Sequence, residues 1–260
     1  MDEILEYLEG DRRTLRACSL TCKALFRSAR RVIHRRLYVA GPGKVTTVDE
    51  REPLRYGSAN RSHLHTFSMA AQCGLVHYTQ ELTIKVGEAF TPGNLRPYLS
   101  QFQTFARLTS LTLHHFNPTP FLPVFEQYFG HLAQQMRSLK FIHPSGPQDN
   151  MMYFICQFPN LDDLGLSPFP SHNLDPSKEH SMSSIQSSPT LRGALRIAIT
   201  NGWSTNPLEC LARLPSGLRF RSIEFLHCAG INPDVIIREC ASTLQFLTCV
   251  SYTREFPLDT

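Results

Sequence analysis

The sequence predicts an α/β protein in which a short helical segment precedes parallel strands that alternate with helices. A pattern of apolar-x-x-apolar-x-apolar recurs along residues 62–260, and each copy is as short as a buried strand. Apolar residues at helical spacing lie between several copies. Helix-start signals, a cap residue followed by proline, occur at Asn206-Pro207 and Asn232-Pro233. Strand and helix in alternation are typical of a parallel sheet with helices outside it.

Residues 1–40 are expected to form short amphipathic helices. Ile4, Leu5 and Leu8 are spaced as on one turn of a helix, and Asp11 is placed to cap the helix that follows. A second apolar stripe continues through Leu15, Cys18, Cys22, Leu25, Phe26, Ala29, Val32 and Ile33. A bundle this small holds little core, so its exposed apolar residues would need a partner surface. The alternative is that they pack on the rest of this chain.

The net charge of +4 is located in the same segment. Residues 1–40 hold nine Arg or Lys and five Asp or Glu, and nine minus five equals the net charge of the whole chain. The rest of the chain is therefore neutral on balance, and a basic surface for nucleic acid is not indicated. We interpret the basic residues as the solvated side of the helices; contact with phosphates is the alternative.

Composition places the chain among globular proteins. Hydrophobic residues make up 42% of it, and no stretch approaches the roughly 18 apolar residues of a membrane span. The first ten residues hold acids and no base, unlike a signal peptide. The eight cysteines include no C-x-x-C pair, which favours reduced, buried thiols. We expect a cytoplasmic or nuclear protein that does not contact a membrane.

The recurring pattern has the spacing of a repeat. Its central apolar residues fall at positions 82, 111, 139, 164, 195, 223 and 244. The intervals are close to the period of about 20–29 residues of leucine-rich repeats, and the copies resemble L-x-x-L-x-L-x-x-(N/C). Cys228 and Cys249 stand at the final position of the last two copies. Stacked repeats would give a curved solenoid with an open concave sheet; the alternative is an ordinary α/β domain.

Helices and loops are expected between the strands. Helical spacing predicts helices over residues 94–108, 121–136, 150–158, 208–214 and 234–240. Residues 41–61 are polar and predict a linker or loop, and residues 167–190 are rich in Ser and Pro and predict a long loop. The expected organisation is thus a helical module over 1–40, the linker, and a repeat region over 62–260.

No group of residues predicts catalysis. His63-x-His65 and His114-His115 are the only histidine clusters, and neither has a third metal ligand at a diagnostic distance. There is no G-x-S-x-G, phosphate loop or H-E-x-x-H. The neighbours His227 and Cys228 would point to opposite faces of a strand. We expect no enzyme, no metal and no cofactor; an enzyme is the weakest of the alternatives.

What remains is recognition on the concave face of the sheet. In each strand the residue between the two apolar positions, and the next position outward, would face this surface. The expected target-binding residues are Lys140, Ile142, Arg196, Glu224, Leu226, Gln245 and Leu247. Apolar residues flanked by charges suit a protein partner. The alternative is that the tail over 252–260, or the serine-rich loop, covers this face.

Residues 2–39 resemble the latter part of an F-box of the fungal type. The matching residues are Glu3-Ile4-Leu5, Tyr7-Leu8, Leu15, the run Cys18-Ser19-Leu20-Thr21-Cys22-Lys23, and Phe26 after Leu25. The family opens with a Leu-Pro pair ahead of this segment, and the sequence shows none. The F-box is therefore expected to be incomplete at its N-terminus.

The resemblance implies a substrate-recognition subunit of an SCF-type (cullin–RING) ubiquitin ligase. The residues expected to dock on the Skp-type adaptor, and through it on a cullin, are Ile4, Leu5, Leu8, Leu15, Leu20, Leu25 and Phe26. The repeat surface would bind an unknown target protein, and no homo-oligomer is expected. The alternative is a non-catalytic leucine-rich-repeat scaffold with a degenerate F-box that no longer binds the adaptor.

Overall fold

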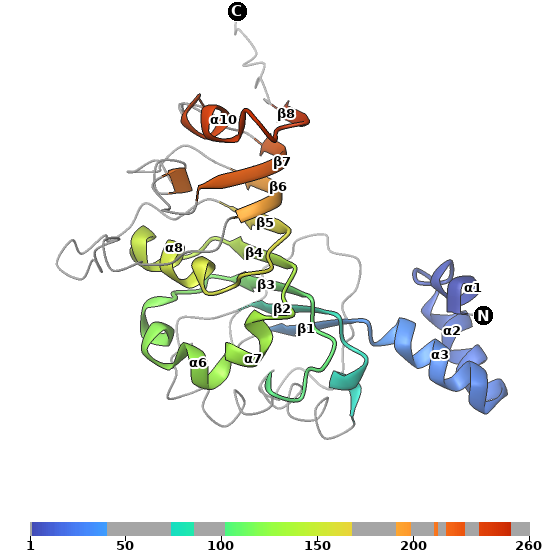
Figure 1. The fold of residues 1–260 in the computed structure, drawn as a ribbon. Coiled ribbons are helices and arrows are strands. Elements are labelled where there is room, and N and C mark those ends of the chain that lie inside the picture. The colour runs from blue at the N-terminus through green and yellow to red at the C-terminus, as the bar shows by residue number, and fades with distance from the viewer. Residues whose placement is uncertain are drawn as a thin grey trace, which may run out of the picture. The chain divides into compact units, whose positions relative to one another are not determined.

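The computed structural model describes residues 2–40, 74–85, 102–167, 191–198, 211–212, 217–226 and 234–250. These residues include helices and eight strands, and the strands form one sheet in the order of the chain, β1 to β8 (Figure 1). The strand pairs within each of the two compact units are parallel. These units are residues 1–115 with 123–136, and residues 116–122 with 137–260. The expected α/β class is confirmed.

The first unit begins with three helices, α1 (Asp2–Glu6), α2 (Arg12–Thr21) and α3 (Lys23–Ile33). Asp11 caps α2 as expected, because its carboxylate accepts hydrogen bonds from the backbone N–H and the hydroxyl of Thr14. These bonds stabilise the ionised carboxylate and lower the pKa of Asp11. The helices share a small core made of Leu5, Leu15, Ala29, Val32 and Ile33, with Leu8, Cys18 and Leu25 packed against it.

The strands β1 (Arg36–Ala40), β2 (Glu81–Lys85) and β3 (Ser110–His114) follow in the same unit, with a short 3-10 helix η1 (Leu75–His77) before β2. Leu37, Leu82 and Leu111 are in register and form a buried row. Each strand starts in the same way: the N–H groups of Gln80 and Glu81 donate to the Arg35 carbonyl. The next strand repeats this at the Gln80 carbonyl. The strands are therefore structurally equivalent units.

Aromatic residues pack the helices of the first unit. The expected single helix over 121–136 is divided into a 3-10 helix η2 (Thr119–Val124) and the short helices α6 (Phe125–Tyr128) and α7 (Gly130–Ala133). Pro123 lies inside η2, where it has no backbone N–H for a helical hydrogen bond. The Phe129 ring lies 5.6 Å from the rings of both Phe102 and Phe125. Apolar spacing thus predicted the buried face correctly, but not the breaks.

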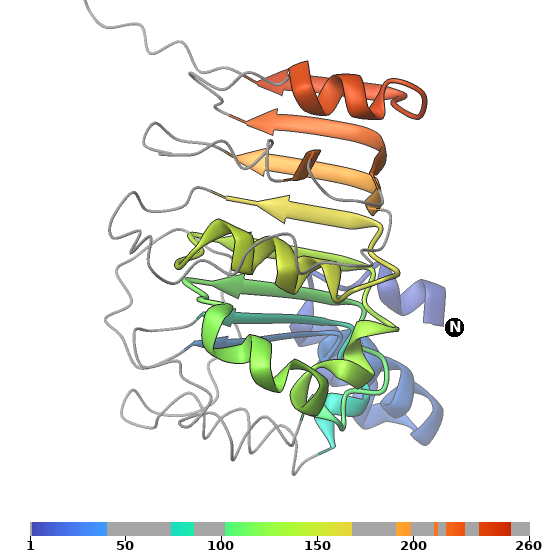
Figure 2. The same cartoon turned by 60° about the vertical axis from the view of Figure 1, so that its left-hand side comes forward.

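The second unit contains β4 (Ser138–Ile142), α8 (Gln148–Cys156), β5 (Asp163–Leu166), β6 (Leu191–Ala198), β7 (Leu218–Leu226), α10 (Asp234–Cys240) and β8 (Phe246–Val250). The two helices lie on the same face of these strands (Figure 2). They match the helices expected over 150–158 and 234–240. The expected linker, the Ser/Pro-rich loop, most of the helix over 94–108 and most of that over 208–214 lie outside the described residues.

Phenylalanine rings fill the space between α8 and β4. Phe116 lies 5.0 Å from Phe121 and 5.3 Å from Phe154, and Phe154 lies 5.5 Å from Phe158. Phe141 of β4 meets Phe154 edge-on. All five side chains are fully buried. Ring pairs in these tilted and offset arrangements add to the free energy gained from burial.

The last strand lies three residues further along the chain than its copy of the pattern indicates. Ile223 of β7 pairs with Leu247, whereas the pattern placed Leu244 opposite it. Both Leu244-x-Phe246 and Leu247-x-Cys249 fit the apolar-x-apolar spacing, so only pairing with β7 decides between them. With Leu247 as the central residue, Leu244 takes the first apolar position of the copy.

Candidate protein-binding surfaces

Exposed apolar side chains gather on the three N-terminal helices. Ile4, Tyr7 and Leu20 are 69%, 92% and 86% exposed, and Phe26 is 40% exposed. We call these four residues the helical surface. The small core of the helices is formed by other residues, among them Leu5 and Leu15. Exposed large apolar residues in such a group favour contact with another protein.

The structure separates the seven expected adaptor-binding residues into two sets. Ile4, Leu20 and Phe26 are exposed, whereas the other four lie in or against the small core, namely Leu5, Leu8, Leu15 and Leu25. The helical spacing of these four residues indicates a buried stripe, and the structure shows that their own helices bury it. Tyr7 was not among the expected residues, although it is the most exposed of the large apolar side chains described.

A buried histidine, His34, follows the C-terminal end of α3. His34 is nearly inaccessible, and burial is the main cause that lowers its pKa to about 4. The positive charges of Arg30, Arg12 and Arg16 lower it further. The ring is therefore neutral at physiological pH.

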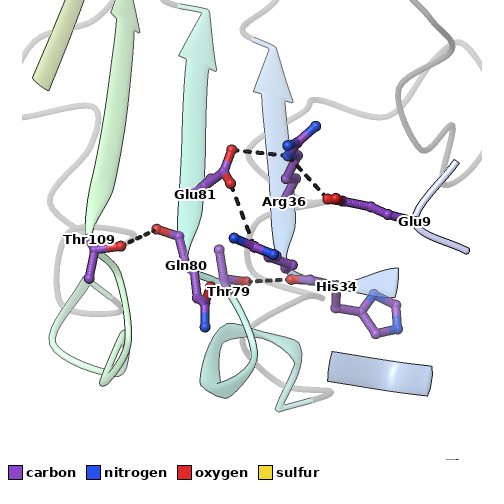
Figure 3. Close-up of polar contacts among 8 residues, drawn as sticks. Glu9, His34, Arg36, Thr79, Gln80, Glu81 and Thr109 are labelled. Carbon is purple, nitrogen blue, oxygen red and sulfur yellow. Dashed lines mark hydrogen bonds and ion pairs between the residues drawn. The ribbon is translucent and has the colours of Figure 1, made fainter. Parts of the chain in front are cut away.

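Polar contacts connect the N-terminal helices with the first two strands. Arg36 of β1 lies between two carboxylates, with its Nε 3.4 Å from Glu9 and 3.0 Å from Glu81 (Figure 3). The Thr79 hydroxyl donates a hydrogen bond of 3.3 Å to the His34 carbonyl. Arg35 also approaches Glu81, at 3.7 Å. Glu9 and Glu81 are therefore both paired with arginines at the start of β1.

The second candidate surface is the face of β4–β8 opposite α8 and α10, which we call the open face. Lys140, Gly165, Arg196 and Glu224 are in register across four strands and form its central row. Since successive side chains of a strand point to opposite faces, this row faces away from the buried leucines. Register thus places Lys140, Arg196 and Glu224 on one face of the sheet, and their role in target binding stays a prediction.

Ion pairs arrange the charges of the open face. The Lys140 Nζ lies 3.4 Å from Oδ2 of Asp163, which also accepts a hydrogen bond of 3.0 Å from Ser138. The Arg196 Nε lies 3.3 Å from Oε2 of Glu224. A side chain at Gly165 would meet Lys140, because an added Cβ lies 2.9 Å from its Cγ. Because Gly165 has no side chain, the Lys140 side chain can lie over β5 at this position.

At the C-terminal end of the sheet the expected site residues differ from the observed ones. Gln245 precedes β8, and Leu247 aligns with buried Ile223 and so lies on the face of the helices. Both expectations were wrong because the strand begins later than predicted. Register places Phe246, Thr248 and Val250 on the open face instead. The other expected positions, Ile142 and Leu226, are half-buried there.

The buried thiols of the second unit are poor nucleophiles. Burial raises the pKa of Cys156 to about 12, and burial is also the main cause that raises the pKa of Cys240. A thiol attacks as its thiolate, which both environments disfavour. Within the part of the chain that the structure describes, no three His, Cys, Asp or Glu side chains are grouped as metal ligands. None of the helices described has the length and apolarity of a membrane span.

Comparisons with protein-family models, curated proteins and solved structures found no match to this chain. The two surfaces are therefore interpreted from their own residues. The helical surface is apolar and includes a cation–π contact between Arg30 and Phe26, and the open face carries ion pairs and half-buried apolar side chains.

Proposed function

We propose that the chain is a substrate-recognition subunit of an SCF-type ubiquitin ligase. Its N-terminal helices act as an F-box that docks on a Skp-type adaptor, and through it on a cullin. The strands and helices that follow form a leucine-rich-repeat solenoid that holds a target protein. Ubiquitin transfer is then carried out by other subunits of the ligase.

The helical surface is the observation that carries this proposal. Ile4, Tyr7 and Leu20 are largely exposed on helices that bury Leu5 and Leu15. Hydrophobic burial at roughly 25 cal/mol per Å² makes such residues the natural anchors of an interface. The same starting hydrogen bonds at β2 and β3, and the parallel pairing of β4 to β8 in chain order, support the repeat part of the proposal.

The test is binding of the purified chain to a purified Skp-type adaptor by isothermal titration calorimetry. An Ile4→Asp, Leu20→Asp variant places charges on two exposed side chains of different helices and leaves the small core intact. We expect the native chain to bind and the variant to lose at least tenfold in affinity. A Leu5→Asp substitution would be unsuitable, because Leu5 is buried and its loss would unfold the helices.

A matched control separates the helical surface from general changes in charge. An Arg13→Asp, Arg27→Asp variant alters two exposed charged residues of α2 and α3 and none of the four apolar side chains. We expect it to bind the adaptor within about threefold of the native chain, because it keeps the apolar side chains of the helical surface. No binding by the native chain would overturn the adaptor proposal and favour the scaffold alternative.

The burial of four expected adaptor residues is what favours that second candidate, the non-catalytic scaffold. Only Ile4, Leu20 and Phe26 remain exposed from the expected set. In a scaffold the open face would still bind its target without an adaptor. In both candidate functions, the Lys140→Glu, Arg196→Glu variant should lose a target that the native chain binds. The Ile4→Asp, Leu20→Asp variant should still bind it.

A further inference from the structure

The strands of the second unit carry a local excess of positive charge. Strands β4–β8, together with the residue before each strand, contain six Arg or Lys and three Asp or Glu. Six minus three leaves an excess of three positive charges, although residues 41–260 as a whole are neutral on balance. The cations are Arg137, Lys140, Arg192, Arg196, Arg219 and Arg221.

Two of these arginines have no acidic partner. Each of the three acids is already paired with another cation of the same strands. The ion pairs are those of Asp162 with Arg137 and Arg192, of Asp163 with Lys140, and of Glu224 with Arg196. Within the described residues, no carboxylate pairs with Arg219 or Arg221. The positive excess is therefore concentrated at the first half of β7.

The register of the sheet brings a third arginine beside Arg219. Arg192 of β6 and Arg219 of β7 are direct partners in the register, and adjacent strands lie about 4.8 Å apart. The residues before them, Leu191 and Leu218, are buried, so the two exposed arginine side chains lie on the open face. Like charges directly opposite each other in a sheet are unfavourable, and a bound anion would relieve this repulsion.

A bulge in β7 adds the remaining arginine. Read against β6, the register passes from Phe220 directly to Ser222, so Arg221 is an extra residue between them. Its side chain is exposed, whereas Phe220 is buried. Bulges redirect side chains and occur often next to functional sites. We call Arg192, Arg219 and Arg221 the strand arginines.

Exposed apolar side chains follow on the neighbouring strand. Register pairs Ser222, the residue after Arg221, with Phe246 of β8, whose side chain is 66% exposed. Val250 lies on the same face of β8 and is 37% exposed, and its partner Leu226 is half-buried. Unpaired arginines and an exposed aromatic ring thus lie on adjacent strands, and these residue types are common anchors of protein interfaces.

We propose that the strand arginines bind an acidic segment of the target protein, whose apolar side chains cover Phe246 and Val250. The Asp or Glu carboxylates of that segment would accept charge-assisted hydrogen bonds from the guanidinium groups. The inference rests on the proposed function in one respect, that the open face holds a target. It adds the chemistry by which the target is recognised.

The composition of this surface favours an acidic protein over a nucleic acid. Binding to a phosphate backbone depends on several cation–phosphate contacts, whereas the excess here is only three charges. Burial of the aliphatic side chains of Val250 and Leu226 contributes to binding of a protein and not to contacts with phosphates. A protein segment with carboxylates beside apolar residues matches both parts of the surface.

The experiment measures fluorescence polarisation of a labelled peptide in which Glu residues stand next to Leu and Phe residues. A counterpart with Gln in place of Glu is the uncharged ligand, and a labelled DNA strand of the same charge is the nucleic-acid ligand. The protein is the full chain, as native protein and as the Arg219→Gln, Arg221→Gln variant. The matched control, Arg13→Gln, Arg27→Gln, removes the same charge from exposed positions of α2 and α3.

We expect the Arg219→Gln, Arg221→Gln variant to bind the Glu peptide about tenfold more weakly, because it loses charge-assisted hydrogen bonds. The control should change by less than about threefold. The Gln peptide should bind more weakly than the Glu peptide, and added salt should reduce that difference. A Phe246→Ala variant should also weaken binding of the Glu peptide, because the ring is part of the proposed contact. Circular dichroism checks that the variants keep their fold.

Equal losses in the arginine variant and the control would overturn the proposal. Failure of the native chain to bind the Glu peptide, or tighter binding of the DNA than of the peptide, would overturn it as well. The adaptor is not part of this experiment. A failure here is therefore distinguishable from a failure of the proposed function, which calorimetry with the adaptor reports separately.

Discussion

The backbone conformation at position 193 favours glycine. Its φ of +89° lies in the region that favours glycine, and it stands where the register of β6 against β7 shifts. A Cβ added at this position would overlap the backbone carbonyl of Asp162, the residue just before β5. That carbonyl accepts a hydrogen bond from Ala194, so it is held in place.

Gly193→Ala is therefore expected to destabilise the protein by more than about 3 kcal/mol, from strain and overlap together. Gly217→Ala is the matched control, because Gly217 also has a positive φ, +69°, but has open space around its Cβ position. It should cost about 1–2 kcal/mol. Urea unfolding of the two variants measures the difference, and equal losses would contradict the bulge geometry.

His34 gives the protein a dependence on pH. Its pKa is about 4 in the folded chain and 6.5 when exposed, so the unfolded state takes up a proton first as the pH falls. The free energy of unfolding should therefore decrease as the pH is lowered from 6.5 towards 4. His34→Phe removes this contribution and should flatten that part of the stability curve. Urea unfolding of the native chain and the variant between pH 6.5 and 4 measures this dependence. The same decrease in the free energy of unfolding in both proteins would refute the role of His34.

Residue spacing alone could not distinguish the buried from the exposed apolar residues of the N-terminal helices. Leu15 and Leu20 lie in the same helix and both belong to apolar patterns, yet the first is fully buried and the second is exposed. The difference depends on which side of α2 meets α3, and a spacing pattern does not contain that information. The cap at Asp11, by contrast, depends on local geometry and was predictable.

At the scale of elements, the phenylalanine cluster between α8 and β4 holds the second unit together. Phe154 contacts three other rings, those of Phe116, Phe141 and Phe158. Phe154→Ala should reduce the free energy of unfolding by about 3–5 kcal/mol, through lost burial and the cavity left behind.

The control for this variant is Phe246→Ala. Phe246 lies in β8 and is 66% exposed, so its truncation should cost less than about 1 kcal/mol. Urea titrations of both variants, followed by far-UV circular dichroism, make the comparison. Similar losses in the two variants would mean that the ring cluster is not the main support of this unit.

The strands were predictable as elements because each copy of the pattern places two leucine-like residues on the buried face. Leu164 and Leu166, for example, lie in β5 and are both buried. The register of β8 was not predictable, because the two overlapping apolar pairs near Leu244 and Leu247 satisfy the same rule. Pairing with β7 is a long-range interaction and decides between them.

At the scale of the whole molecule, composition and alternation of elements were sufficient for the α/β class and the parallel sheet. The charge balance was also informative, because the positive excess lies in residues 1–40, whose arginines help to lower the pKa of His34. The binding surfaces were predictable only in part, since the exposure of a side chain depends on tertiary packing. Tyr7 and Phe246 show this, because no local rule distinguishes them from core aromatics.

The central claim is the proposal that the helical surface binds the adaptor and the open face binds the target. Its most direct test is to mix the full chain with a Skp-type adaptor and a cullin, and to measure the mass of the complex by light scattering. We predict a complex with one copy of each protein. The open-face variant Lys140→Glu, Arg196→Glu should assemble as the native chain does, and Ile4→Asp, Leu20→Asp should not. Failure of the native chain to join the adaptor and cullin would contradict the account.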